Sequence, residues 1–494
     1  MALGKVVKGG AWLYGTNLVN NLFGAFYWFI ISAIGGPEIL GVTSAIIGFA
    51  GLVSGLANFG VGVGVLKFVG RYFGEGGLEE ISGYFWTSLI FLLSTVTVSG
   101  FFLLVAGFLG FNFSGLTDKM LVLAGVIVCL AFSSLFNTFL TALVRTDLIF
   151  KSNLLANIAK LVVGLGLVAA GWGWIGAVLG YAAISIVNAV ILGFSVFKIV
   201  GLKPSFSLFR LRNLLKAGLV NWIPGIITLA GQWLGVLAVF GSSGAFETGL
   251  YYVAFSIANV VLMVATSLSM ILLPVLSGMS DGRKRAAWRV ARVGLAFAWP
   301  LAVFVAVYPW LPLSVLGRSF TGASMVLDVL ILSLIFIVLS SSVINLSYAY
   351  DLYRYVLAIG LAANIPRVVL YYLLVPVYGG LGAAASFSFG AFTGFLAALV
   401  VAGRIGFRIN FRDLSLIVPA PALFGVFSYF FNLHFLVGGV LIYAFSILFY
   451  LKVGVLTRED VKEVVFNLFP PKCSNLICGL AAKLKLKEKI WSTR

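Results

Sequence analysis

The sequence predicts an all-α polytopic membrane protein with about fourteen transmembrane helices, in two parallel-repeat six-helix lobes followed by two extra C-terminal helices. Three observations lead to this prediction: an apolar composition, long apolar runs, and a duplication that relates two parts of the chain. Hydrophobic residues make up 61% of the 494 positions and charged residues only 10%. The mean hydropathy is +1.11, which lies well outside the range of soluble domains.

Apolar runs long enough to cross a membrane recur along almost the whole chain. A helix needs about 20 residues to cross a hydrocarbon core of about 30 Å. The runs cover approximately 10–33, 40–66, 83–108, 120–144, 150–171, 174–197, 217–240, 248–275, 290–312, 322–347, 353–377, 381–403, 414–432 and 435–453. The first run is longer than a signal-peptide core and no Ala-x-Ala-type cleavage site follows it, so we expect it to be the first span.

The positive charges lie on one side of the predicted membrane. The formal net charge is +18, and 29 of the 33 Lys and Arg residues fall in the termini, in the even-numbered gaps between spans, or within three residues of the span ends beside them. Cations resist translocation and favour the anionic inner leaflet. We therefore expect a multi-pass protein of the cell membrane with both termini cytoplasmic. A basic face for nucleic acid is a poor interpretation of this distribution.

Matching residues recur at a nearly constant offset, which indicates an internal duplication. Gly41 matches Gly249 at an offset of 208, and the offset is 207 for the pair Asn157 and Asn364. The pattern predicts an N-terminal lobe over 1–205 and a C-terminal lobe over 206–410, as parallel copies about an axis along the membrane normal.

The chain beyond residue 410 stands outside the repeat. The last two spans occupy 411–456, and a basic stretch follows over 457–494. We expect this stretch to lie as an amphipathic segment on the inner leaflet, with a disordered tail as the alternative.

Two cations fall inside predicted spans, at equivalent positions of the two copies. Lys160 follows Asn157 by three residues, and Arg367 follows Asn364 by three. A cation facing lipid at mid-depth would cost on the order of 2.5–3.5 kcal/mol. Either each cation pairs with carbonyl or Asn oxygens and fixes its lobe, or both line a polar cavity between lobes. We favour the cavity as the prediction.

Amide side chains follow the same helices. Asn153, Asn157 and Lys160 occur at i, i+4 and i+7, which places them on one stripe of one helix. The candidate substrate-binding residues are Lys160, Arg367, Asn157, Asn364, Asn153, Asn137, Asn345, Asn17, Asn20, Asn21, Asn221 and Gln232.

Acidic and catalytic signals are sparse. Of fifteen Asp and Glu residues, only Asp328 lies even one or two turns inside a predicted span. Proton- and sodium-coupled antiporters usually need a carboxylate within the bilayer. There is no phosphate-binding G-x-x-x-x-G-K-[ST] motif, and the three cysteines lack a ligand pair. We expect no catalytic residue, metal or cofactor.

Three stretches resemble a known family. "GPEILGVTSAIIGFAGLVSGLANFGVGVGVLKFVGRYF" at 36–73, its weaker echo "FETGLYYVAFSIANVVLMVATSLSMILLPVLSGM" at 246–279, and "LTALVRTDLIFKSNLLANIAKLVVGLGLVAAGWGWIGAVLGYA" at 140–182 resemble polysaccharide-biosynthesis flippases. These belong to the multidrug/oligosaccharidyl-lipid/polysaccharide (MOP) flippase superfamily. The resemblance implies two six-helix lobes facing each other across a cavity, and alternating access that moves a polyprenyl-linked oligosaccharide outward.

Two other branches of the superfamily differ from this sequence in the first span. The multidrug and toxin extrusion (MATE) branch has acidic residues in its N-terminal lobe, where this chain has Asn17, Asn20 and Asn21. Lipid II flippases carry cations in their first span, and the run 10–33 has none.

The sequence thus favours a flippase rather than an enzyme. We expect it to translocate a polyprenyl-diphosphate-linked oligosaccharide from the cytoplasmic to the outer face, because Lys and Arg in a low-dielectric cavity bind phosphate. The expected partners are this glycan lipid and membrane lipids. A cation-coupled multidrug exporter and a membrane-embedded glycosyltransferase or polymerase are the alternatives. The sugars, the polyprenol, the energy source and the oligomeric state stay open.

Overall fold

The protein is helical throughout the part of the chain that the structure describes. The computed structural model describes residues 3–278, 281–457 and 460, without the side chains of 3–11, 14, 221 and 267–278. Most of the predicted segment 457–494 therefore lies outside the described residues. No strand occurs in the described ranges, where one isolated bridge joins Phe113 to Leu116 in a loop.

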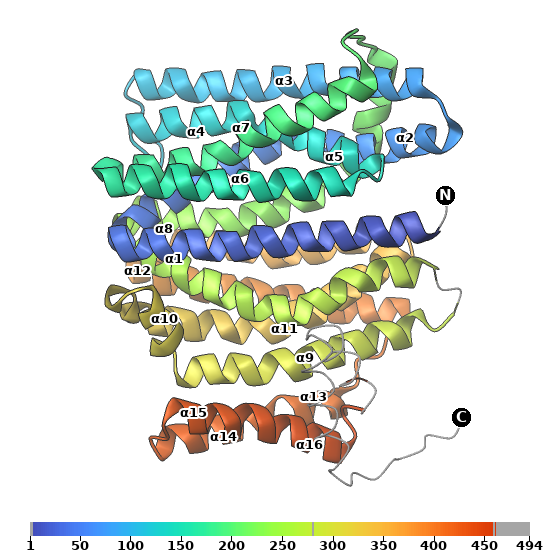
Figure 1. Ribbon diagram of the computed structural model, residues 1–494. Helices are drawn as coiled ribbons and strands as arrows, with labels where there is room; N and C mark the ends of the chain where they lie inside the picture. Colours follow the sequence, from blue (N-terminus) through green and yellow to red (C-terminus); the bar gives the residue numbers. More distant parts are fainter. Residues whose placement is uncertain (1–2, 279–280, 458–459, 461–494) are drawn as a thin grey trace. The chain divides into compact units, whose positions relative to one another are not determined.

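Sixteen α-helices follow one another along the described chain (Figure 1). They are α1 (Leu3–Asn58), α2 (Val61–Glu75), α3 (Leu78–Phe108), α4 (Asp118–Leu130), α5 (Ser134–Ala142), α6 (Thr146–Leu167), α7 (Gly173–Val200), α8 (Leu208–Gly278), α9 (Arg283–Val307), α10 (Trp310–Leu316), α11 (Ser324–Ala349), α12 (Tyr353–Ile405), α13 (Phe411–Ile417), α14 (Pro419–Phe430), α15 (Phe435–Gly439) and α16 (Phe445–Val453). Short 3₁₀ or π segments connect some of them: η1 (Ala131–Ser133), η2 (Val168–Trp172), η3 (Arg318–Ala323) and η4 (Val440–Ala444).

Ten helical segments of the described chain are long and apolar enough to cross a membrane. Four of them have 44, 45, 53 and 55 residues, which is about twice what one crossing needs. The described helices therefore have enough length for the fourteen predicted crossings, and the count of crossings itself stays a prediction.

Some predicted boundaries were wrong. The runs 10–33 and 40–66 were predicted as separate spans, and α1 does break between them, at Gly36. The second run was predicted to continue to about residue 66, but its helix ends at Asn58 and Val61 starts a new one. The run 120–144 was predicted as one span, and the 3₁₀ turn η1 divides it into α4 and α5. Apolar composition does not reveal a break of two or three residues within an apolar run.

The long helices break at glycines that are equivalent in the repeat. Gly36 in α1 has φ 67° and ψ −171°, and Gly244 in α8, at the offset of 208, has φ 81° and ψ −175°. Gly173 after η2 has φ 53° and ψ −133°, and Gly379 in α12, at an offset of 206, has φ 52° and ψ −129°. The duplication is therefore visible in the backbone itself.

The helices form two compact units. Unit 1 comprises Met1–Val253, Ser314–Ala323 and Asn364–Phe387, and unit 2 comprises Ala254–Leu313, Ser324–Ala363 and Ser388–Arg494. Their boundaries differ from the boundary predicted between lobes at residue 205. Compactness and sequence repetition are different properties of a chain, so the two-lobe division stays a prediction.

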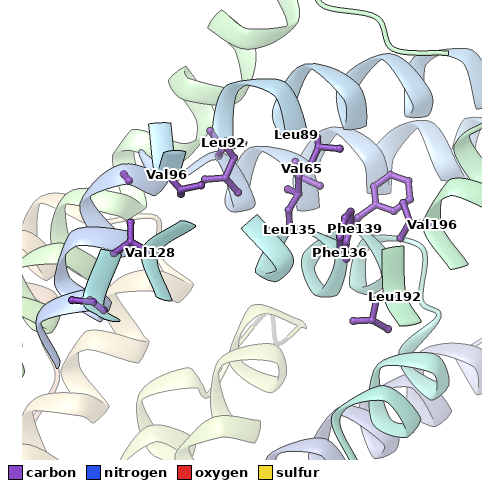
Figure 2. Close-up of a cluster of buried hydrophobic side chains, with 14 of the residues drawn as sticks. Val65, Leu89, Leu92, Val96, Val128, Leu135, Phe136, Phe139, Leu192 and Val196 are labelled. Carbon is purple, nitrogen blue, oxygen red and sulfur yellow. The ribbon is translucent and has the colours of Figure 1, made fainter. Parts of the chain in front are cut away.

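Unit 1 has a core of closely packed aliphatic and aromatic side chains. Figure 2 shows part of it, where Phe136 and Phe139 of α5 lie near Val196 of α7. The ring centroids of Phe85 and Phe139 are 4.7 Å apart. In lipid, such helices associate through close van der Waals contact rather than through the hydrophobic effect, because the tails are as apolar as the side chains.

Unit 2 is held together by α9, which packs against α11 and α14. The Trp299 indole N–H donates to the carbonyl of Val418 at 2.9 Å. The Tyr308 hydroxyl donates to the carbonyl of Leu433 at 2.9 Å and lies 2.7 Å from the Ser428 hydroxyl. These bonds connect α9 to the junction of α13 and α14 and to the loop that follows α14.

The break at Gly36 generates a stability prediction. A φ near +67° with ψ near 180° is essentially restricted to glycine, so Gly36→Ala should lower the stability of the fold by about 1–3 kcal/mol. Gly24→Ala is the matched control, because a Cβ meets no atom within 4 Å at either position and Gly24 is helical. Thermal unfolding in detergent would measure both. Equal melting temperatures for the two variants would contradict the assignment of strain at Gly36.

Candidate functional site

Lys160 lies inside unit 1, among the helices of the N-terminal half of the chain. It is on α6 and only 3% exposed. Its ammonium lies 5.1 Å from the ring centroid of Tyr27 on α1 and 5.9 Å from that of Tyr181 on α7. Within the described residues it makes no ion pair or hydrogen bond. Aromatic faces attract a cation but do not neutralise it, so a net positive charge stays in this interior.

The predicted stripe of amides is present on α6 and extends to two other helices. The Asn157 amide donates to Asn20 Oδ1 on α1 at 2.7 Å and to the carbonyl of Asn153 at 2.8 Å. Asn153 in turn donates to Asn137 Oδ1 on α5 at 3.2 Å and to the carbonyl of Ile149 at 2.9 Å. Four of the predicted site residues therefore form one polar network beside Lys160.

The network reaches a polar cavity in unit 1 through Asn137. The cavity has a volume of about 350 Å³, and several hydroxyl and amide side chains line it. The polar members are Ser54, Asn58, Ser133, Ser134, Asn137, Ser185 and Asn188. The Ser152 hydroxyl on α6 donates to Asn188 Oδ1 at 2.7 Å, which connects the wall of the cavity to α6 again.

Arg367 is the second buried cation of unit 1. It lies on α12 and is 7% exposed. Its Nη1 donates to Asn364 Oδ1 at 3.0 Å and its Nη2 to the carbonyl of Phe387 at 3.5 Å. The guanidinium carbon lies 4.1 Å from the centroid of the Phe387 ring. Its Nε is buried without a hydrogen-bond partner among the described residues, so the group has an unused donor.

Tyrosine and glycine exchange places around the two cations. Tyr27 packs against Gly164 on α6 and donates to the carbonyl of Ala177. The residues equivalent to Tyr27 and Gly164 in the repeat are Gly235 and Tyr371, and Tyr371 packs against Gly235. In the first copy the tyrosine is on α1 and the glycine on α6. In the second copy the tyrosine is on α12, the equivalent of α6, and the glycine is on α8, the equivalent of α1. A Tyr at both positions would collide, and a Gly at both would leave a void.

Sequence reasoning missed these aromatic neighbours and part of the cavity wall. Tyr27, Tyr181 and Phe387 give no signal against an apolar background of 15% aromatic residues. Asn58 and Asn188 do give one, because each is an isolated amide in a long apolar run.

The other predicted site residues do not join the two centres in the structure. Asn17 and Asn21 are exposed on α1, as Asn20 is, but within the described chain neither takes part in the hydrogen bonds of Asn157. Gln232 is half-buried on α8, and Asn345 lies on α11 in unit 2. Asn221 falls outside the side chains that the structure describes. The binding role of all twelve residues stays a prediction.

Carboxylates are almost excluded from the interior. Among the described residues, Asp460 is the one buried acidic residue, and it belongs to unit 2. Asp328 is half-buried on α11, and its Oδ1 has no hydrogen-bond partner in the described ranges. No group of three or more His, Cys, Asp or Glu residues in the described chain could hold a metal ion.

The close approach of α8 to Arg367 generates a second prediction. A Cβ at Gly231 would overlap the Asn364 amide oxygen and approach Arg367 Nη1 at 3.0 Å. Gly231→Ala should therefore displace both side chains and lower the stability by about 1–3 kcal/mol. Gly225→Ala on the same helix is the control, since a Cβ there meets no atom within 4 Å. If Gly231→Ala unfolds at the same temperature as Gly225→Ala in a thermal scan, the packing of Asn364 against α8 is not as described.

Comparison with known proteins gives both a family and a fold. The model of the polysaccharide biosynthesis protein family matches residues 45–325, which is more than half of the chain. No curated protein sequence matches the chain.

Three solved structures show the same fold at low sequence identity. A MurJ lipid II flippase in an inward closed conformation has a TM-score of 0.62 and 17% identity, covering 87% of this chain and 99% of its own. An inward-facing MATE transporter of the MOP superfamily has a TM-score of 0.63 and 16% identity, covering 78% and 94%. A MOP-superfamily transporter from Pyrococcus furiosus, described as having a binding pocket of reverse polarity, has a TM-score of 0.57 and 15% identity, covering 81% and 95%.

The helical architecture, the repeated backbone breaks and the family match lead to one conclusion. The chain is a multi-pass membrane protein of the polysaccharide biosynthesis protein family, with the fold of MOP-superfamily transporters.

Proposed function

We propose that the protein is a flippase that moves a polyprenyl-diphosphate-linked oligosaccharide from the cytoplasmic to the outer face of the cell membrane by alternating access. Both termini are cytoplasmic in this proposal. The observation that carries it is the presence of two buried cations, Lys160 and Arg367, at equivalent positions of the repeat. In unit 1, no described carboxylate is buried with them.

A cation without an anion in the interior is costly, which is why an anionic ligand fits. Removing one partner of a buried ion pair typically costs about 3–5 kcal/mol, because a charge is left uncompensated. The same cost is relieved when a ligand brings the missing negative charge. A lipid diphosphate carries about two negative charges and many acceptor oxygens, which match an ammonium and the free Nε–H of a guanidinium.

The polar cavity of unit 1 fits the sugars. Its volume of about 350 Å³ is in the range of small-ligand sites, and hydroxyl and amide groups line it. Ser and Asn side chains both donate and accept hydrogen bonds, as sugar hydroxyls do. The network from Asn137 through Asn153 to Asn157 runs from this cavity toward Lys160. A headgroup could therefore place its sugars in the cavity and its phosphates beside the cation.

Two comparisons support this proposal over its alternatives. The family match is to polysaccharide biosynthesis proteins, and one structural relative flips lipid II, which is itself a lipid-linked glycan. A cation-coupled multidrug exporter is disfavoured, because the one buried acid in the described chain, Asp460, is paired with Arg289 and Arg292. A membrane-embedded glycosyltransferase or polymerase is disfavoured by the relatives, which are transporters.

Substitution of the two cations tests the proposal. Lys160→Gln and Arg367→Gln should each slow the flipping of a lipid-diphosphate-linked sugar in liposomes by about tenfold or more. This factor corresponds to the loss of one charge-assisted hydrogen bond to the substrate. Lys151→Gln on α6 and Arg354→Gln on α12 are matched controls, because both cations are exposed on the same helices.

Melting temperatures measured in parallel separate a binding role from a structural one. If the Lys160 and Arg367 variants transport at the rate of the controls, the proposal is wrong. If they lose stability and transport together, the cations fix the helices rather than bind the substrate.

A further inference from the structure

A strongly basic cavity lies in unit 2, where α9 begins and α12 ends. It has a volume of about 380 Å³ and is separate from the polar cavity of unit 1 in its lining residues. Its wall consists mostly of cationic side chains. The lining residues are Lys284, Arg285, Trp288, Arg289, Arg292, Gly406 and Arg408. Five of the seven are cations, so the wall repels itself unless an anion is present.

The helix geometry concentrates these cations. Arg285, Arg289 and Arg292 occur at i, i+4 and i+7 and therefore share one face of α9. Gly406, the C-cap of α12, lies close enough for a Cβ to approach Lys284 Nζ at 3.2 Å. Arg408 follows in the loop before α13. The N-terminus of a helix carries a partial positive charge and repels cations in the first turn. The arrangement therefore destabilises the helix by itself.

Two described carboxylates contact the cluster, Asp460 through two arginines and Asp413 through Trp288. Asp460 accepts from Arg289 Nε at 2.7 Å and from Arg292 Nη2 at 3.3 Å. Burial favours the neutral acid, but hydrogen bonds from the Thr457 backbone N–H and from Arg289 outweigh it and hold the pKa of Asp460 below its usual value. Among the described residues, two carboxylates therefore stand against five cations.

Arg292, one of the lining residues, also has an unused donor. Arg292 Nε is buried and has no hydrogen-bond partner among the described residues. A buried donor without a hydrogen bond costs free energy, so a ligand oxygen that accepts from it would relieve this cost. Trp288 fixes the wall on this side, because its indole N–H donates to Asp413 Oδ2 on α13 at 3.0 Å.

We propose that this cavity, called the α9 basic pocket and formed by Lys284, Arg285, Trp288, Arg289, Arg292, Gly406 and Arg408, binds the phosphate headgroup of an anionic membrane phospholipid. Phosphate is the chemistry that matches several converging Lys and Arg side chains. A lipid is favoured over a free phosphate because the pocket lies at the polar ends of apolar helices. A tryptophan at such a place marks the headgroup level of a membrane.

The charge distribution agrees with a lipid of the inner leaflet. The loop before α9 is one of the gaps that the cation bias assigns to the cytoplasmic side, and that leaflet carries anionic lipid. The bound headgroup would join α9, the end of α12 and the start of α13 through one shared anion. This site is independent of the flippase proposal, since none of its residues belongs to unit 1.

Lipid titration of the purified full chain in neutral detergent tests the proposal. The probe is dioctanoyl phosphatidylglycerol, with dioctanoyl phosphatidylcholine and inorganic phosphate as separate arms, and the readout is the melting temperature. Phosphatidylglycerol should raise the melting temperature, and the two other additives should not. The double variant Arg285→Gln with Arg408→Gln should raise the half-saturating lipid concentration about tenfold or more.

The variant and its control are chosen to keep the fold intact. Arg285 and Arg408 are exposed, and neither pairs with Asp460. The control is Lys203→Gln with Arg212→Gln, which removes two exposed cations near the start of α8 and should leave the half-saturating concentration unchanged. Equal lipid response of both double variants would overturn the site. Equal protection by inorganic phosphate or by phosphatidylcholine would overturn the lipid headgroup as its ligand.

Discussion

The constraint on which the site depends is the cost of keeping a positive charge inside a membrane protein without an anion. Lys160 and Arg367 are both almost fully buried, and each meets aromatic faces instead of carboxylates. An amide oxygen and a backbone carbonyl accept hydrogen bonds from Arg367, and its Nε has no partner in the part of the chain that the structure describes. These dipoles and ring faces make the buried charge tolerable. In the proposed function, a negative ligand compensates it fully.

The duplication explains why there are two such cations. Equivalent glycines break the long helices with nearly the same backbone angles, and equivalent Asn residues precede the two cations by three positions. The copies have nevertheless diverged where they must fit together. Tyr27 faces Gly164 in one copy, and Gly235 faces Tyr371 in the other. The combined volume of the two side chains is therefore conserved, while the helix that supplies the tyrosine changes. Packing constrains the combined volume of the two side chains more than the identity of either residue.

The sequence predicted the membrane class, the helices and the two cations, because each depends on composition or on local spacing. The stripe of Asn153, Asn157 and Lys160 was correct for the same reason, since helical periodicity fixes which residues share a face. The sequence could not predict which amide side chain of α1 contacts α6. Asn17, Asn20 and Asn21 are all exposed, and Asn20 is the one that accepts from Asn157, which depends on the rotation of α1 against α6. The aromatic partners of the cations were invisible, because aromatic residues are common throughout an apolar chain.

The sign of the cargo's charge is the central claim, and the membrane potential tests it most directly. Moving a headgroup of about two negative charges outward across an inside-negative membrane releases about 2.3 kcal/mol per charge per 100 mV. The measurement is the rate of lipid-linked sugar export from proteoliposomes whose potential is clamped with valinomycin and potassium, at constant proton and sodium gradients. An anionic cargo predicts faster export as the interior becomes more negative. Export that ignores the potential and stops when the proton or sodium gradient collapses would contradict the account and favour an antiporter, with Asp328 as the first residue to substitute.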